Sequence, residues 1–143
     1  MFEETERFTV LRFGYEHTLQ ELAQYRHLVE VKKVLDNISS SPDFILISNE
    51  KNKDNKLEVF TVEVKYRSSQ NPKEIKEIAE KILKIWNPSS LFLATLNGFF
   101  FSSCSSVVKN EGQVSRLSDK WVSERLREKY FELLRDFEKS HNH

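Results

Sequence analysis

Hydrophobic and polar residues alternate most regularly in the stretch from Ser41 to Arg67. An apolar run at residues 44–47 is followed by the polar segment 49–56 and then by residues 57–67, which are rich in Val, Phe and Thr. β-Branched and aromatic residues favour strands, and strand side chains alternate between the two faces of a sheet. The pattern therefore predicts a β-hairpin whose polar loop is mobile, because it has no apolar anchor.

The segment after this hairpin, residues 72–86, has the spacing of a helix with one apolar side. Asn71 can cap its N-terminus and Pro72 suits the first helical position. Asn87-Pro88 ends the pattern. These signals together predict a helix with defined limits.

Two further helices are predicted nearer the ends of the chain. Residues 14–38 follow mostly helical spacing, although residues 28–36 could also form an exposed strand. The C-terminal segment has apolar residues at helical spacing from Ser118 onward, with Ser118 or Asp119 as its cap. Its last residues, 140–143, are predicted to be a frayed tail.

Shorter apolar runs predict the remaining strands. Residues 91–96 and 99–101 are joined by Asn97-Gly98, a pair typical of a two-residue hairpin turn. Three consecutive Phe residues at 99–101 put apolar groups on both faces, so we expect this strand to be covered on both sides. Further strands could form at residues 5–13, 107–108 and 113–117, the first of which could instead lead into a helix.

The predicted order is helix, two strands, helix, two or three strands, helix. Helices between strands are typical of an α/β fold with a mixed central sheet flanked by helices. The connection from Lys65 through a helix to Leu91 predicts two parallel strands, with the strand of Glu63 inside the sheet. No repeat or long linker divides the chain, so one domain is predicted over residues 1–143.

The composition indicates the cellular compartment of the protein but does not identify its reaction. Lys plus Arg and Asp plus Glu both number 22, so the formal charge is zero, which neither supports nor excludes a nucleic-acid partner. The single Cys104 excludes an internal disulfide and fits a reducing compartment. The chain shows no signal peptide, and no apolar run approaches the ~20 residues of a membrane helix. The sequence thus predicts a cytoplasmic protein without a membrane partner.

Three ionisable residues, Asp43, Glu63 and Lys65, interrupt the apolar hairpin. Glu63 and Lys65 are two residues apart, so their side chains project to the same face of the second strand. Asp43 follows Pro42 at the start of the first strand and reaches the same volume if the two strands pair in a suitable register. Two carboxylates in proximity repel each other, but they provide the oxygen ligands that Mg²⁺ prefers.

Pro42-Asp43, followed after a hairpin by Glu63-Val64-Lys65, resembles the signature of the PD-(D/E)XK nuclease superfamily. The resemblance extends more loosely to the neighbouring helices and to the strand at 91–96. It implies a restriction-endonuclease-like fold and an endonuclease that hydrolyses phosphodiester bonds, with DNA as its expected substrate. It also implies Mg²⁺ or Mn²⁺ as the cofactor.

The resemblance assigns roles to the hairpin residues. Asp43 and Glu63 would be direct metal ligands and the Val64 carbonyl a third, while Lys65 would hold or activate the attacking water and steady the phosphate. Such a metal ion polarises the phosphoryl oxygen and lowers the pKa of bound water. The resemblance thus implies that Asp43, Glu63 and Lys65 are catalytic.

Two additional residues complete the predicted site. The family usually adds an acidic residue from its first helix, and Glu16 best matches that position, with Glu21 and Glu30 as alternatives. Glu30 could instead pair with Arg26 four residues earlier. Arg67 continues the face of Glu63 and Lys65, and it is therefore expected to contact nucleic acid at the rim of the site.

Other interpretations of the same residues stay open at this point. Glu63 and Lys65 could be a solvated pair on a sheet surface, and Asp43 a turn residue after Pro42. Alternatively, the chain could be a catalytically inactive nuclease-fold interaction module or a subunit of a larger complex. A nuclease of this size has little surface for choosing a target, so a homodimer or a protein partner is also expected.

Overall fold

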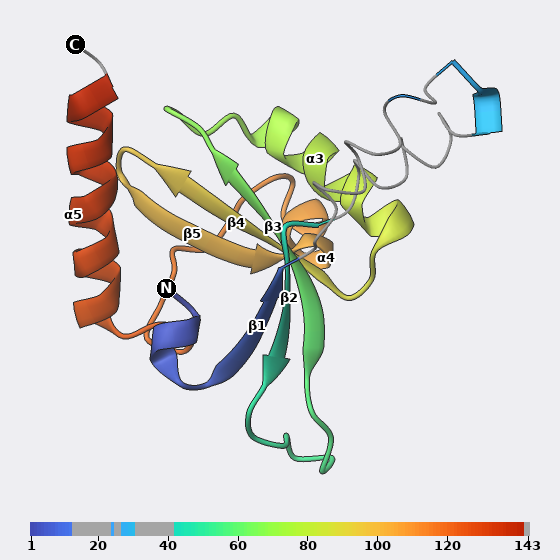
Figure 1. The fold of residues 1–143 in the computed structure, drawn as a ribbon, viewed down its shortest axis with the longest axis horizontal. Coiled ribbons are helices and arrows are strands. Elements are labelled where there is room, and N and C mark those ends of the chain that lie inside the picture. Colours follow the sequence, from blue (N-terminus) through green and yellow to red (C-terminus); the bar gives the residue numbers. More distant parts are fainter. Residues whose placement is uncertain (13–23, 25–26, 31–41, 142–143) are drawn as a thin grey trace.

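A computed structural model describes residues 1–12, 24, 27–30 and 42–141. Its centre is a five-stranded sheet in which the strands follow one another in chain order (Figure 1). The strands are β1 (Phe8–Arg12), β2 (Phe44–Ser48), β3 (Val59–Tyr66), β4 (Ser89–Thr95) and β5 (Gly98–Ser103). Neighbouring strands are antiparallel except β3 and β4, which are parallel. The predicted mixed sheet is thereby confirmed.

Helices cover both faces of this sheet. They are the 3₁₀ turn η1 (Glu3–Thr5) and the α-helices α3 (Pro72–Ile85), α4 (Cys104–Lys109) and α5 (Glu124–His141). α3 and α4 lie on one face, and α5 stands at the opposite side of the molecule (Figure 1). The α/β class is therefore confirmed. The helix predicted at 14–38 falls mostly outside the described residues.

The α3 helix has the limits that its sequence predicts. The Asn71 side chain accepts a hydrogen bond from the Glu74 amide, and Pro72 is the first helical residue. Ile75 and Ala79 bury the inner side of the helix against the sheet. Because α3 connects β3 to the parallel strand β4, the predicted interior position of the strand that carries Glu63 is confirmed.

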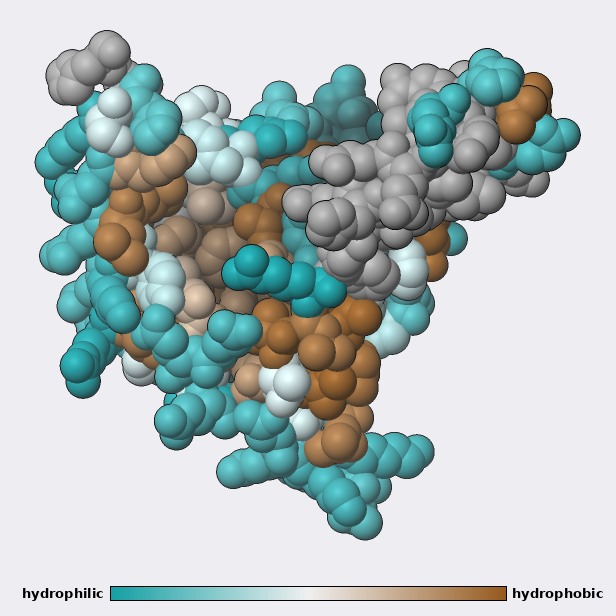
Figure 2. All heavy atoms as spheres, viewed as in Figure 1, coloured by the Kyte–Doolittle hydropathy of each residue, from teal (hydrophilic) through white to brown (hydrophobic). Residues whose placement is uncertain are grey.

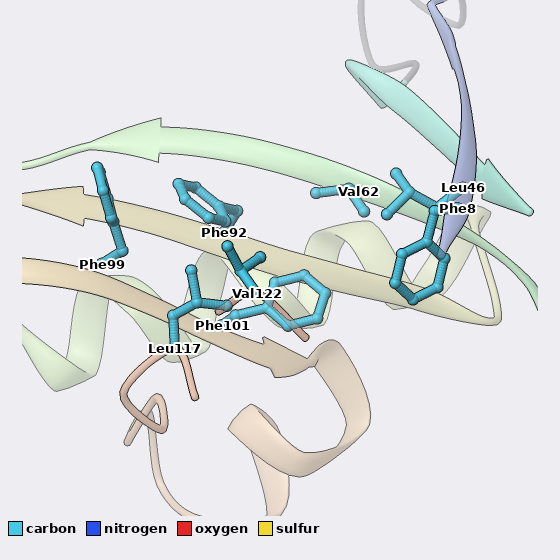
Figure 3. Close-up of a cluster of buried hydrophobic side chains, with 8 residues drawn as sticks. All are labelled: Phe8, Leu46, Val62, Phe92, Phe99, Phe101, Leu117 and Val122. Carbon is cyan, nitrogen blue, oxygen red and sulfur yellow. The ribbon is translucent and has the colours of Figure 1, made fainter. Parts of the chain in front are cut away.

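Two apolar clusters lie on opposite faces of the sheet. The α5-side cluster consists of Phe8, Leu46, Val62, Phe92, Phe99, Phe101, Leu117 and Val122 (Figure 3). The α3-side cluster consists of Ile75, Ala79, Leu91, Leu93, Phe100, Cys104, Val107 and Val114. Phe99 and Phe101 belong to one cluster and Phe100 to the other, so β5 is covered on both sides as predicted.

The segment after β5 differs from the sequence prediction. Residues 107–108 were expected in a strand but lie in α4, which Ser103 caps by accepting a hydrogen bond from the Ser106 amide. The other possible strand, residues 113–117, is confirmed in part: Arg116 forms an isolated antiparallel bridge with Phe100, and the amides of Phe101 and Leu117 donate to the carbonyls of Ser115 and Phe99. A local cap and burial of Val107 against α3 thus prevailed over the strand preference of two adjacent valines.

The terminal helix also begins later than predicted. It starts at Glu124 rather than at Ser118, because Ser118 accepts hydrogen bonds from the amides of Trp121 and Val122 in a separate turn. That turn places the Val122 side chain in the α5-side cluster. At its other end, α5 continues to His141, so residues 140 and 141 are helical rather than part of a tail.

Both hairpin turns have a specific hydrogen-bonded structure. β4 and β5 are joined by Leu96-Asn97, with Gly98 already paired to Thr95, so the prediction of Asn97-Gly98 as the turn was wrong by one residue. At the tip of the β2–β3 hairpin, the Asn52 side chain accepts hydrogen bonds from the amides of Asp54 and Lys56. The polar tip therefore has an anchor that the sequence prediction did not include.

No helix in the described part of the chain is long and apolar enough to cross a membrane.

Candidate functional site

Asp43 lies at the point where β2 begins to pair with β3. Pro42, immediately before it, is fully buried, which fixes the entry of the chain into the strand. Phe44 pairs with Val62, so continuing the antiparallel register by one residue brings Asp43 to the level of Glu63. The Asp43 Oδ2 atom accepts a hydrogen bond from the Val64 amide at 2.8 Å. The carboxylate is thus held against the strand that carries the other two predicted residues.

Glu63 and Lys65 project from β3 toward the α3 side of the sheet. Their strand partners on β4 are Leu91 and Leu93, both of which belong to the α3-side cluster. The Lys65 Nζ atom lies 2.9 Å from the Glu63 Oε1 atom. The Glu63 side chain is only 16% exposed and that of Lys65 is 34% exposed. The Glu63 carboxylate is thus largely shielded from solvent, whereas the Lys65 side chain is partly exposed.

The surroundings of Glu63 disfavour its ionised form. Burial raises the pKa of its carboxyl group above the ordinary value, and the nearby negative charge of Asp43 raises it further. The hydrogen bond and positive charge of Lys65 act in the opposite direction but do not cancel the rise. An additional cation next to Asp43 and Glu63 would therefore be electrostatically favourable.

The donor atoms present fit a hard divalent cation. Asp43 and Glu63 provide carboxylate oxygens, and the carbonyl of Val64 lies between Glu63 and Lys65 on the same strand. Oxygen-only donor sets suit Mg²⁺ or Mn²⁺. The candidate set has only two carboxylates, and the described residues contain no group of three or more His, Cys, Asp or Glu side chains that could hold a metal ion.

The additional acidic residue is not located by the structure. Glu16 and its alternative Glu21 lie outside the described residues. Glu30 is described, and its side chain is exposed. The contribution of a residue from the first helix therefore stays a prediction.

Arg67 lies where β3 leads toward α3, and its guanidinium is already engaged. Its Nε atom is 2.8 Å from Glu74 Oε1, and its Nη1 atom donates to the Tyr66 carbonyl at 2.8 Å. These contacts connect the end of β3 to the first turn of α3. A nucleic-acid contact by Arg67 stays a prediction, and it would have to share or replace the ion pair with Glu74.

Cys104 lies close to the site in a way that the sequence did not indicate. Its thiol is completely buried, and its pKa is raised first by burial and also by the negative charge of Glu63, while a contact with Ser89 opposes the rise. A raised pKa makes the thiol a poor nucleophile. Cys104 is therefore a core residue, and its closeness to Glu63 depends on how β3, β4 and β5 pair, which no local pattern reveals.

The opposite face of β3 borders a cavity of about 190 Å³. Its walls include the side chains of Val62 and Val64, and Arg12 lies at its edge with its guanidinium over the Phe44 ring. Figure 2 shows apolar atoms gathered on this side of the molecule. The cavity and the Glu63 carboxylate therefore lie on different faces of β3.

Comparison with protein-family models, curated proteins and solved structures finds no match to this chain.

Proposed function

We propose that the chain is a Mg²⁺-dependent nuclease that hydrolyses phosphodiester bonds in DNA. The observation that carries the proposal is the hydrogen bond from the Val64 amide to Asp43. It holds one carboxylate next to the strand from which Glu63 and Lys65 project together. A site built for stability alone would gain little from two adjacent carboxylates, one of them mostly buried.

The proposal includes a restriction-endonuclease-like fold. The support is the order and pairing of the elements around the site. Asp43 precedes β2, the Glu63-Val64-Lys65 tripeptide is on the antiparallel neighbour β3, and α3 leads to the parallel strand β4. This arrangement agrees with the core order implied by the sequence resemblance.

Each residue of the site has a defined contribution in this proposal. Asp43, Glu63 and the Val64 carbonyl would hold the metal ion, which when bound polarises the phosphoryl oxygen and lowers the pKa of a coordinated water. Lys65 has one ammonium group within hydrogen-bond distance of Glu63 and can donate its other protons to a water or a phosphate oxygen. The side chains of Glu63 and Lys65 project toward the α3 side of the sheet, so the substrate would bind at this face.

The experiment is a cleavage assay with single-stranded, duplex and branched DNA in the presence and absence of Mg²⁺ and Mn²⁺. The variants Glu63→Ala and Lys65→Ala are compared with Glu77→Ala, which changes an exposed position on α3. We expect metal-dependent cleavage by the wild type and by the control, with a loss of about 100-fold or more in the two site variants. Equal activity in all four proteins would refute the proposal.

A second candidate is a non-catalytic interaction module of the same fold. The observation that favours it is that both cationic side chains next to the site already form ion pairs, Lys65 with Glu63 and Arg67 with Glu74. Calorimetric titration with Mg²⁺ and Mn²⁺ distinguishes the two. A wild type that binds neither ion favours the module, whereas binding that Asp43→Ala abolishes favours the nuclease.

A further inference from the structure

The helix α5 lies at the edge of the molecule and packs on one side only (Figure 1). It is 18 residues long, and none of its residues is fully buried. Four of its side chains, Leu126, Tyr130, Phe131 and Leu134, pack partly buried against the α5-side cluster. Much of the surface of this helix is therefore available to another molecule.

An apolar stripe runs from the packed side of α5 toward its exposed side. Two of its members, Leu126 and Tyr130, also pack against the α5-side cluster, and the other two are exposed. The stripe consists of Leu126, Tyr130, Leu133 and Phe137, which are spaced by four, three and four residues. This is the spacing of the apolar positions in a coiled-coil heptad, and at 100° per residue the four side chains fall within about 60° of one another. Leu133 and Phe137 are 54% and 56% exposed. Figure 2 shows apolar atoms along this helix between hydrophilic ones.

We propose that α5 pairs with α5 of a second copy of this chain, in antiparallel orientation, with the two-fold axis next to Leu133. The apolar stripe of one copy then packs against the same stripe of the other copy. Leu133 meets Leu133 of the other copy, and Tyr130 of each copy meets Phe137 of the other. A two-fold interface of this kind requires such self-complementarity, because the same surface serves on both sides.

The charges beside the stripe support the antiparallel orientation. Lys129 and Asp136 lie on its solvent-facing border, four residues before and three residues after Leu133. An antiparallel pair centred on Leu133 brings Lys129 of each copy to the level of Asp136 of the other. A parallel pair would place each charge at the level of its like charge. The helix thus carries two complementary ion pairs for one orientation only.

Both charged side chains are exposed and can reach a second copy of the chain. Lys129 is 3.1 Å from Glu4 in its own chain, but its side chain is 56% exposed and its ammonium can serve a second carboxylate. Asp136 is exposed and forms no salt bridge with another described residue. The formal charge of zero for the whole chain means that two copies do not repel each other at long range.

The test is sedimentation equilibrium of the full chain over a range of concentrations. We expect a dimer with twice the mass of the 17.0 kDa chain. Leu133→Glu should weaken the dimer by about 100-fold, because it places two like charges in an apolar contact. Glu132→Ala, on the far side of the helix, is the matched control and should leave the dissociation constant unchanged. A wild type that stays monomeric would overturn the proposal.

A charge exchange tests the orientation without placing a charge in the apolar stripe. Lys129→Asp and Asp136→Lys should each weaken the dimer by about tenfold, since each replaces two attractions with two repulsions. The double variant restores opposite charges at the paired positions and should restore the dissociation constant to near the wild-type value. Circular dichroism confirms folding of every variant. A double variant as weak as either single one would overturn the antiparallel pairing.

Discussion

At the scale of single residues, the Asp43 carboxylate has two separable properties. It accepts the hydrogen bond from the Val64 amide, which is a structural contact, and it supplies a negative charge beside Glu63. Only the second property is needed for a metal site. Substitutions that keep or remove the acceptor can therefore distinguish a structural aspartate from a metal ligand.

We predict that Asp43→Asn and Asp43→Ala differ in stability but not in activity. The asparagine keeps an oxygen that can accept from the Val64 amide, so its free energy of unfolding should stay near that of the wild type. The alanine loses the hydrogen bond and should lose about 1 kcal/mol. Both variants should lose Mg²⁺ binding and DNA cleavage. Urea denaturation and calorimetry check these outcomes, and an active Asp43→Asn variant would contradict the assignment of a charged ligand.

The raised pKa of Glu63 predicts a pH dependence of stability in metal-free buffer. Between the ordinary carboxyl pKa of 4.5 and the higher folded value, the folded protein holds a proton that the unfolded chain has released. Stability from this residue therefore falls as the pH rises through that interval. Glu63→Gln should be more stable than the wild type at pH 7, and the difference should vanish at pH values below 4.5.

Thermal unfolding of both proteins at several pH values is the measurement. Glu77→Gln is the control, because Glu77 is exposed on α3. Addition of Mg²⁺ should reverse the order at pH 7, since the proposed ion stabilises only the ionised wild type. A Glu63→Gln variant that is less stable than the wild type at pH 7 would show that the ion pair with Lys65 outweighs the burial of the carboxylate.

At the scale of elements, the loop after α4 packs closely against the start of α3. Gly112 in this loop makes the closest approach, to the backbone of Pro72. Gly112 has a φ of +88°, and a Cβ atom placed there would lie 1.9 Å from the backbone oxygen of Pro72. Gly98 also has a positive φ, of +137°, but the nearest atom is the end of the flexible Arg116 side chain at 2.9 Å. Both glycines thus have a φ that other residues rarely adopt, but the space around them differs.

We predict that Gly112→Ala is the more damaging of the two substitutions. Gly98→Ala should cost about 1–2 kcal/mol, as expected for a side chain forced into a positive-φ conformation. Gly112→Ala carries that cost and must also move the start of α3 away from the loop, so a loss above about 3 kcal/mol is expected. Urea denaturation measures both. Equal losses would show that the loop moves without resistance.

Elements with local signals were predicted well, and elements decided by packing were not. The limits of α3 follow from Asn71 and Pro72, and the hairpin follows from alternation, so both could be seen in the sequence. The late start of α5 depends on burial of Val122 in a cluster assembled from distant strands. Asp119, one of the two predicted caps, accepts a hydrogen bond from the Glu124 amide at the observed start of the helix, but the burial of Val122 cannot be seen in residues 118–123 alone.

The candidate site divides in the same way. The alternation of strand side chains predicted that Glu63 and Lys65 share a face. In the structure, the Lys65 Nζ atom lies 2.9 Å from the Glu63 Oε1 atom. The ion pair between Arg67 and Glu74 depends on how the end of β3 meets α3, so the sequence suggested a free rim cation where the structure has an engaged one. The nearness of Cys104 to Glu63 follows from strand pairing across three strands.

At the scale of the whole molecule, the β2–β3 hairpin extends away from the layers of the fold (Figure 1). Its tip carries Lys51, Lys53 and Lys56, all exposed, and none of them forms a salt bridge with another described residue. The strand rises about 3.3 Å per residue, so the tip lies on the order of 20 Å from Glu63 along β3. That length is comparable to half a turn of duplex DNA, about 17 Å.

We therefore predict that the tip lysines contact the phosphates of a duplex that is bound at the site. The triple variant Lys51→Glu, Lys53→Glu, Lys56→Glu should weaken binding to long duplexes and lower the slope of log affinity against log salt by about 2–3, as expected when three phosphate contacts are lost. Cleavage of substrates too short to reach the tip, and the thermal stability of the protein, should be unchanged. Filter binding at several salt concentrations measures the slope.

The matched control reverses three exposed lysines elsewhere, Lys73, Lys81 and Lys84 on α3. These lysines lie near Glu77 and Glu80, just as the tip lysines lie near Glu50 and Asp54, so the two sets differ in position and not in their acidic neighbours. If position decides the effect, the α3 variant keeps the wild-type salt slope although its net charge changes equally. If both variants lower the salt slope by the same amount, the net charge of the protein alone determines the slope, and the prediction of a hairpin contact with the duplex is wrong.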